Sequence, residues 1–136
     1  MFAATLHFRQ QKECILRDLT ERAAEPVRID IEELHDEDVT FILRAGEFAA
    51  EFYDTLATAD HVEHVERLDT DNLLVTKPSC GAYSAIYQNH GTLRRANTIH
   101  GRQRNYRVLV FRRADLKHII EDMRDLGTVT LGRLEE

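Results

Sequence analysis

The sequence predicts an α+β fold in which antiparallel strands alternate with amphipathic helices. Apolar residues recur at every second position in some segments and at intervals of three or four in others, which are the periodicities of strands and helices. The order of these segments starts again after the polar turn at residues 69–71. The chain has 136 residues, 43% hydrophobic and 31% charged, which suits one globular unit with its own core.

The first half of the chain has the periodicities of strand, helix, strand, strand, helix and strand in that order. Phe2, Leu6 and Phe8 fall on one face of the first strand, and Phe48, Phe52 and Leu56 fall on one side of the second helix. The expected strands are 2–8, 27–32, 39–43 and 62–68, and the expected helices are 11–24 and 46–56.

The second half repeats this order. Pro78 and Ser79 favour a helix start, Gly91 a helix end, and residues 101–105 the turn of a hairpin. Gly127 has the position of a C-terminal cap for the last helix. The expected strands are 73–75, 93–100, 106–111 and 129–131, and the expected helices are 78–91 and 115–125.

These elements predict two tandem βαββαβ (ferredoxin-like) halves, residues 1–68 and 72–136, within one compact unit. Each half is expected to be a four-stranded antiparallel sheet with helices on one face. The strand at 108–111 is apolar on both sides, and such strands are usually covered on both sides. The first half, a second subunit or a further domain would then lie on the open face of the second sheet.

The composition indicates a cytoplasmic protein. No apolar run approaches the roughly 20 residues of a membrane span, and the N-terminus lacks the pattern of a signal peptide. Cys14 and Cys80 are the two cysteines, so neither a disulfide framework nor a structural zinc site is expected. Acidic residues number 24 against 18 basic ones, of which three are lysine; a salt-adapted haloarchaeal cytosol or a GC-rich genome explains this usage equally well.

Charge is distributed unevenly along the chain. Residues 73–114 contain no Asp or Glu and carry eight Lys and Arg, although the whole chain has a net charge of −6. The acidic total favours docking of this basic segment on the acidic part of the chain or on a partner. Direct binding of nucleic acid through the same arginines is the alternative, and it would weaken steeply with salt.

Two groups of residues are candidates for ligand binding. The first group lies on or beside one expected helix and consists of Cys80, Tyr83, Tyr87 and His90. These residues either line a ligand pocket, with Cys80 as a redox-responsive thiol, or simply pack against a sheet. The second group lies at the expected hairpin turn and consists of His100, Arg102 and Arg104. These residues either bind an anionic effector or form a solvated turn.

Catalysis and metal binding are not expected. No nucleophile elbow, phosphate loop or spaced catalytic triad occurs, so the chain is expected to be neither an enzyme nor a cofactor-binding protein. His61 and His64 form an HxxH pair, but on the expected strand they point to opposite faces, and no third ligand is evident.

Three segments resemble one known family. These are Ala59–Leu68, the helix end Asn89-His90-Gly91, and the strand Arg107–Phe111 with the following helix from Asp115 to Gly127. In their order and spacing they resemble the domain that precedes the helix-turn-helix in haloarchaeal transcription regulators of the bacterio-opsin activator type. The resemblance covers residues 40–136.

The resemblance implies a regulatory domain that senses a small effector or a protein partner. Separately, the chain is expected to form a homo-oligomer. DNA would be bound only through a C-terminal helix-turn-helix, whose pattern does not occur within these 136 residues. The alternative is a stand-alone, dimeric, ferredoxin-like ligand-binding module with no role in transcription.

Overall fold

The computed structural model of the chain describes residues 1–136 and confirms the α+β fold, with an antiparallel sheet and four α-helices. The strands are β1 (Phe2–Gln10), β2 (Val27–His35), β3 (Asp38–Arg44), β4 (His64–Arg67), β5 (Asn72–Pro78), β6 (Thr92–Leu93), β7 (Asn97–His100), β8 (Gln103–Val110) and β9 (Gly127–Glu135). The helices are α1 (Ile15–Thr20), α2 (Ala49–Ala57), α3 (Ala82–Gln88) and α4 (Arg113–Arg124), with the 3₁₀ turn η1 (Gly46–Phe48) before α2.

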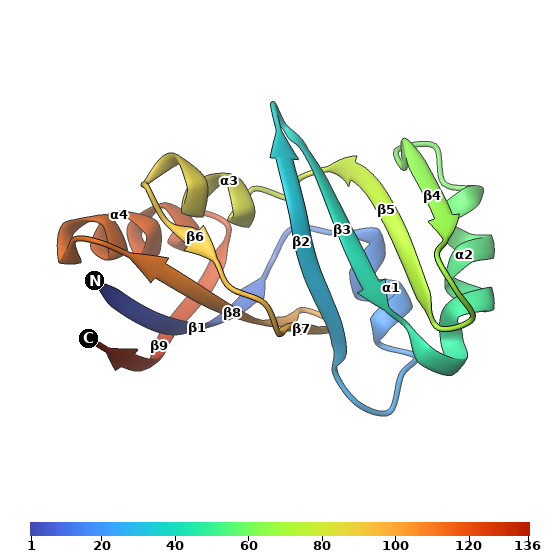
Figure 1. Cartoon of the computed structure of the whole chain (residues 1–136), viewed down its shortest axis with the longest axis horizontal. Helices are drawn as coiled ribbons and strands as arrows, with labels where there is room; N and C mark the ends of the chain where they lie inside the picture. Colours follow the sequence, from blue (N-terminus) through green and yellow to red (C-terminus); the bar gives the residue numbers. More distant parts are fainter.

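All nine strands belong to one sheet, in the order β4-β5-β3-β2-β7-β8-β1-β9, with β6 also pairing with β8. Every pair of neighbouring strands is antiparallel. In Figure 1, α1, α2 and α4 lie behind the strands, so the view is onto a sheet face that carries no helix. The other face, together with the helices, encloses the hydrophobic core.

The structure differs from the expected arrangement in which residues 1–68 and 72–136 each form their own sheet. β1 lies between β8 and β9 of the second half, and β5 lies between β3 and β4 of the first half. Each half therefore receives its first strand from the other. Periodicity identifies a strand and its buried face but not its pairing partner, which is why the sequence did not predict this exchange.

The two sections of the sheet join edge to edge through β2 and β7, where Val27 pairs with Ile99. The first half therefore extends the sheet of the second half and does not cover its open face. Val108 and Val110 are buried on the inner face, whereas Leu109 is only half-buried and Phe111 is 67% exposed in the turn after β8. The expected cover over 108–111 is thus absent from this chain.

Several element boundaries differ from those expected. The first helix is only Ile15–Thr20, and Pro78 ends β5 instead of starting a helix. The expected strand at 93–100 is divided into β6 and β7 at Ala96, whose φ is +72°. Gly127 begins β9 instead of capping α4. Glycine is needed at this position because a side chain would overlap with the backbone carbonyl of Arg9 on the neighbouring β1.

No helix has both the length and the apolar content that crossing a membrane requires.

Candidate functional site

The two segments that carry the chain from one half to the other each contain one cysteine. Cys14 follows β1 and directly precedes α1, and Cys80 follows β5 and precedes α3. Cys14 is 8% exposed and Cys80 is partly buried, and both are free thiols. The exchange of β1 and β5 brings these segments together, so that the two thiols are close enough for each to shift the pKa of the other.

Two buried cations accompany the thiols. Lys77, on the inward face of β5, is 4% exposed; its Nζ donates to the carbonyl oxygen of Pro78 at 2.7 Å and lies 3.5 Å from the Cys80 sulfur. Arg104, on the inward face of β8, is 2% exposed, and its Nε and Nη2 atoms are buried without a hydrogen-bond partner. Neither side chain forms an ion pair with Asp or Glu, which is unusual because buried cations are normally paired.

Polar groups of neutral residues complete the cluster. Tyr83 from α3 and Tyr106 from β8 meet edge to face, with ring centroids 5.5 Å apart. The Tyr106 hydroxyl and the Gln10 Oε1 atom are also buried without a hydrogen-bond partner. Buried polar atoms without partners are rare, and their convergence here gives the cluster spare capacity to bind a negative or polar group.

The charges around the thiols favour ionisation of Cys14. Interaction with the neighbouring Cys80 thiol lowers the pKa of Cys14 most strongly. Burial opposes this effect, and the positive charges of Lys77 and Arg104 reinforce it. The pKa of Cys80 is raised, because its thiol interacts with Cys14 and because it is buried. The two shifts have opposite directions, so ionisation of the pair is favoured at Cys14 and disfavoured at Cys80.

Of the seven residues singled out by the sequence, the structure brings three into this cluster: Cys80, Tyr83 and Arg104. Tyr87 lies elsewhere, at the outer side of α3 with 36% of its surface exposed. His90 lies in the turn after α3, where its backbone has a φ of +64°.

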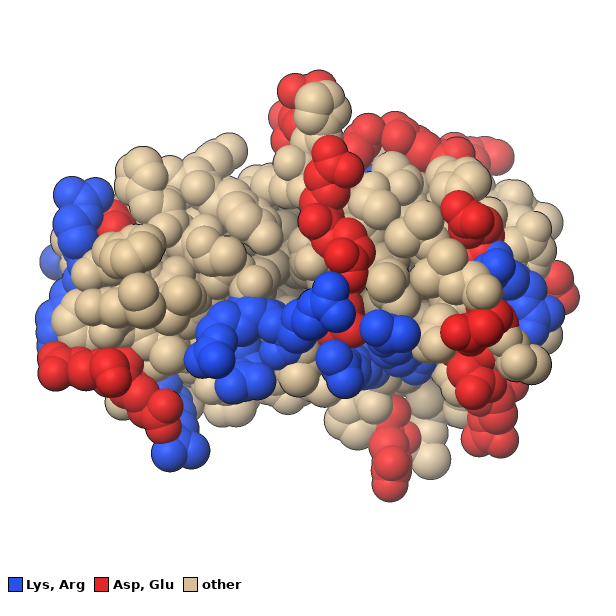
Figure 2. Space-filling model, in the orientation of Figure 1, with Lys and Arg blue, Asp and Glu red and all other residues tan.

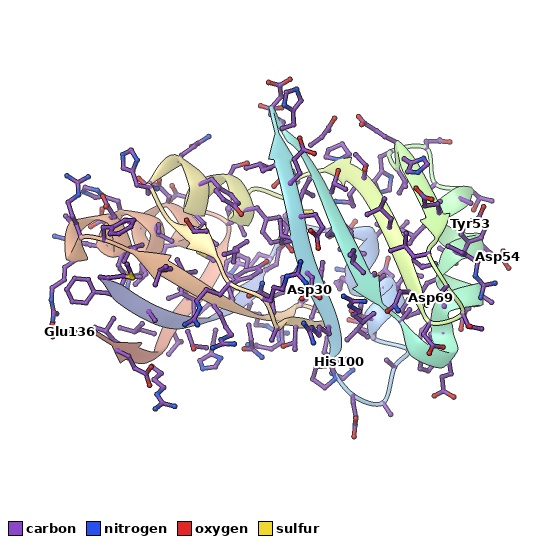
Figure 3. All side chains as sticks on the ribbon, in the orientation of Figure 1. Asp30, Tyr53, Asp54, Asp69, His100 and Glu136 are labelled. Atoms are coloured by element: carbon purple, nitrogen blue, oxygen red, sulfur yellow. The ribbon has the colours of Figure 1, made fainter.

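His100 and Arg102 connect the β7–β8 hairpin to the rest of the chain. The ring nitrogen Nε2 of His100 lies 2.9 Å from the carbonyl oxygen of Ala23, and Figure 3 shows His100 near the loop that leads into β2. Arg102 donates to the carbonyl oxygens of Gln10 and Gln11 at 3.1 and 2.8 Å. These contacts hold the end of β1 and the loop after α1 against the hairpin.

Sequence reasoning missed Cys14, Lys77, Gln10 and Tyr106 as members of the cluster. A signal was present for two of them. Gln10 continues the inward-facing series of β1, and Lys77 continues that of β5, so each is a polar residue at an apolar position of its strand. Such a break in periodicity marks a buried polar side chain that needs a partner.

Both thiols lie at the edge of surface depressions. Cys80 lines a pocket of about 330 Å³ together with Lys12, Ser79 and Ser84. Cys14 lines another of about 290 Å³ with Glu13 and His61. Each cysteine therefore borders a depression at the surface of the protein.

No group of three or more His, Cys, Asp or Glu side chains has an arrangement suited to a metal ion. His64 of the HxxH pair lies on β4, with its Nε2 3.0 Å from a carboxylate oxygen of Glu66.

Comparison of the sequence with models of known protein families and with curated proteins finds no match. The geometry of the site therefore carries the functional argument.

Proposed function

We propose that this chain is a regulatory, sensing domain whose sensor is the Cys14–Cys80 pair and whose effector is an oxidant of the peroxide class. The observation that carries the proposal is the meeting of two thiols beside two buried cations, Lys77 and Arg104, that have no carboxylate partner. Cations beside a cysteine favour the thiolate, which is the nucleophilic form.

The proposed reaction has two steps. The Cys14 thiolate attacks one peroxide oxygen, the O–O bond breaks, and a sulfenic acid forms while hydroxide leaves and is protonated to water. The Cys80 thiol then attacks the sulfenic sulfur, which forms the disulfide and releases a second water. Overall, two thiols are oxidised by two electrons and one hydrogen peroxide is reduced to two water molecules; a cellular dithiol would reverse the change.

Oxidation at this place would have a mechanical consequence. The disulfide would join the segment after β1 to the segment after β5, and these are the two connections through which the halves exchange strands. Relative movement of the halves would then be restricted. A neighbouring domain or bound protein that contacts both halves would respond to this change, which is what a sensing domain requires.

The setting that we propose is an archaeal transcription regulator in which DNA is bound by a separate helix-turn-helix domain. Its support is the resemblance of residues 40–136 to the domain that precedes such a helix-turn-helix. We also propose that the two sections of the sheet are ferredoxin-like halves with exchanged first strands, since each has the strand order 4-1-3-2 once the exchanged strand is counted as the first.

A stand-alone, dimeric ligand-binding module is the second candidate, and β9 favours it. The outer edge of this nine-residue strand is unpaired, and Leu131 and Leu134 are 42% and 36% exposed. Unpaired edges with exposed apolar residues pair readily with a second copy. The coding sequence after Glu136 separates the two settings: an in-frame helix-turn-helix supports the regulator, and its absence supports the module.

The sensing function is tested by treating the reduced chain with hydrogen peroxide and measuring its intact mass. We expect a loss of two hydrogens in the native chain and a dimedone adduct at Cys14 in the Cys80→Ser variant, which cannot complete the disulfide. In the Cys14→Ser variant, Cys80 should react much more slowly. Equal reactivity of the two single variants, or of native and urea-unfolded protein, would rule out a tuned thiol pair.

A further inference from the structure

The open face of the sheet carries a second group of cations, unconnected with the thiols. Thr5 of β1 pairs with Arg107 of β8 on one side and with Arg133 of β9 on the other. The backbone N–H of Arg94, just after β6, donates to the carbonyl oxygen of Arg107 at 2.8 Å. The order across the strands is therefore Arg94, Arg107, Thr5, Arg133, with three arginines in one cross-strand row.

Other arginines near this face are neutralised by carboxylates. Arg28 and Arg44 both donate to the fully buried carboxylate of Asp30, at 3.1 and 3.2 Å, and Figure 3 shows Asp30 on β2 near the middle of the molecule. Arg95 lies 3.5 Å from Glu32. The face is thus not uniformly basic, and most of its positive charges have a partner within the chain.

Arg94 and Arg107 differ, because neither forms an ion pair. The guanidinium group of Arg107 donates only to the backbone carbonyl of Arg95, at 3.3 Å. Like charges on directly neighbouring strands destabilise a sheet. An anion held between Arg94 and Arg107 would remove this repulsion, so the row is arranged to favour a negatively charged ligand.

The row surrounds a pocket of about 180 Å³, whose lining includes Ala3, Thr5, Arg94, Arg107, Arg133 and Glu135. Small side chains at Ala3 and Thr5 leave room above the strands, and the longer arginine side chains rise around this space. Figure 2 looks onto this face and shows Lys and Arg gathered in a band across the middle, with Asp and Glu beside and beyond the band.

We propose that this pocket binds the phosphate group of a small phosphomonoester. Guanidinium groups match the planar pairs of phosphate oxygens, and the Thr5 hydroxyl adds a neutral donor at the centre of the row. Arg133 already pairs with Glu135 at 2.6 Å. The positive charges of Arg94 and Arg107 remain for the ligand, and together they balance the negative charge of a phosphate dianion. Glu135 is then placed to accept a hydrogen bond from a hydroxyl of the same ligand.

Duplex DNA fits the surface less well. The basic band is short and bordered by acidic side chains, and the net charge of the chain is −6. DNA binding needs an extended positive surface that follows the phosphate backbone. The pocket, of about 180 Å³, has room for one phosphate group and not for a continuous phosphate backbone.

The proposal is tested by calorimetric titration of the full chain with inorganic phosphate, with glycerol 3-phosphate and, separately, with a short DNA duplex at low salt. We expect saturable binding of both small ligands, tighter for the phosphomonoester. Arg107→Gln should weaken binding by about tenfold, because it removes one charge-assisted hydrogen bond to the phosphate. Arg124→Gln, which removes the same charge from α4 on the opposite side of the sheet, should change it less than twofold.

Three results would overturn the proposal: no saturation by either small ligand, equal weakening by the two variants, or tight binding of the duplex with none of the phosphomonoester. The last result would assign the row to nucleic acid. A circular dichroism spectrum of each variant shows that it is folded, and Arg94→Gln, a second variant of the row, should weaken binding as Arg107→Gln does.

Discussion

Oxidation of the Cys14–Cys80 pair should stabilise the chain by an amount that follows from its topology. The two cysteines enclose about 66 residues, roughly half of the sequence. A cross-link that closes a loop of this length lowers the entropy of the unfolded chain enough to contribute about 4 kcal/mol at 25 °C. For a domain of this size, this corresponds to a rise in Tm of roughly 12–16 °C.

The assay is differential scanning calorimetry of the fully reduced and the fully oxidised chain, with the Cys80→Ser variant as the matched control. We expect the rise only where both cysteines are present, with reversal by a dithiol reductant. A Tm that is unchanged or lower in the oxidised chain would refute the reasoning. It would mean that the two connecting segments must be distorted before the sulfurs can bond, so that strain offsets the entropic gain.

Three further predictions concern single substitutions. Asp30→Asn should lower the free energy of unfolding by about 1.5–3 kcal/mol at pH 7, since two charge-assisted hydrogen bonds weaken. Burial alone would raise the pKa of Asp30, but its hydrogen bonds lower it below the usual carboxyl value. The Asp30 carboxylate therefore stabilises the fold above the usual carboxyl pKa, and this stabilisation is lost as the pH falls through the lowered pKa of the folded state. Urea unfolding should show the difference in stability between the native chain and Asp30→Asn disappearing in acid. Arg104→Met should raise the pKa of Cys14, because one of the cations that lower it is removed, and should move the pH profile of iodoacetamide alkylation upward; an unchanged profile would exclude Arg104 from this role. Gly127→Ala should cost about 1–3 kcal/mol in chemical unfolding, because the new methyl group meets the backbone of β1, and a neutral effect would contradict the close approach of the strands.

Element type and order could be predicted from the sequence because they depend on local periodicity. Leu6 and Phe8 in β1, or Val39 and Phe41 in β3, alternate in a way that fixes which face is buried. Pairing partners could not be predicted, since the same inward-facing pattern of β1 is compatible with pairing in either half. The exchange of β1 and β5 depends on packing between residues far apart in the sequence.

The candidate site was predicted only in part for the same reason. Cys80 and Tyr83 share one predicted segment, and helical spacing was enough to group them. Arg104 was assigned to a solvated turn or an anion grip at the hairpin, whereas its position on β8 faces inward. Cys14 comes from the other half of the sequence, and only the exchanged strands bring it to Cys80.

The exchange also determines when this sheet can form as the chain leaves the ribosome. β1 is synthesised well before its partners β8 and β9: Ala3 pairs with Leu109 and with Glu135. Its apolar face therefore stays exposed until β8 and β9 have been made, and folding is expected to be slow because its contacts are so distant in sequence. During that interval β1 can pair with the incomplete sheet of a second nascent copy, so that two chains become interlocked. Synthesis at low concentration or in the presence of a chaperone should therefore raise the yield of monomer.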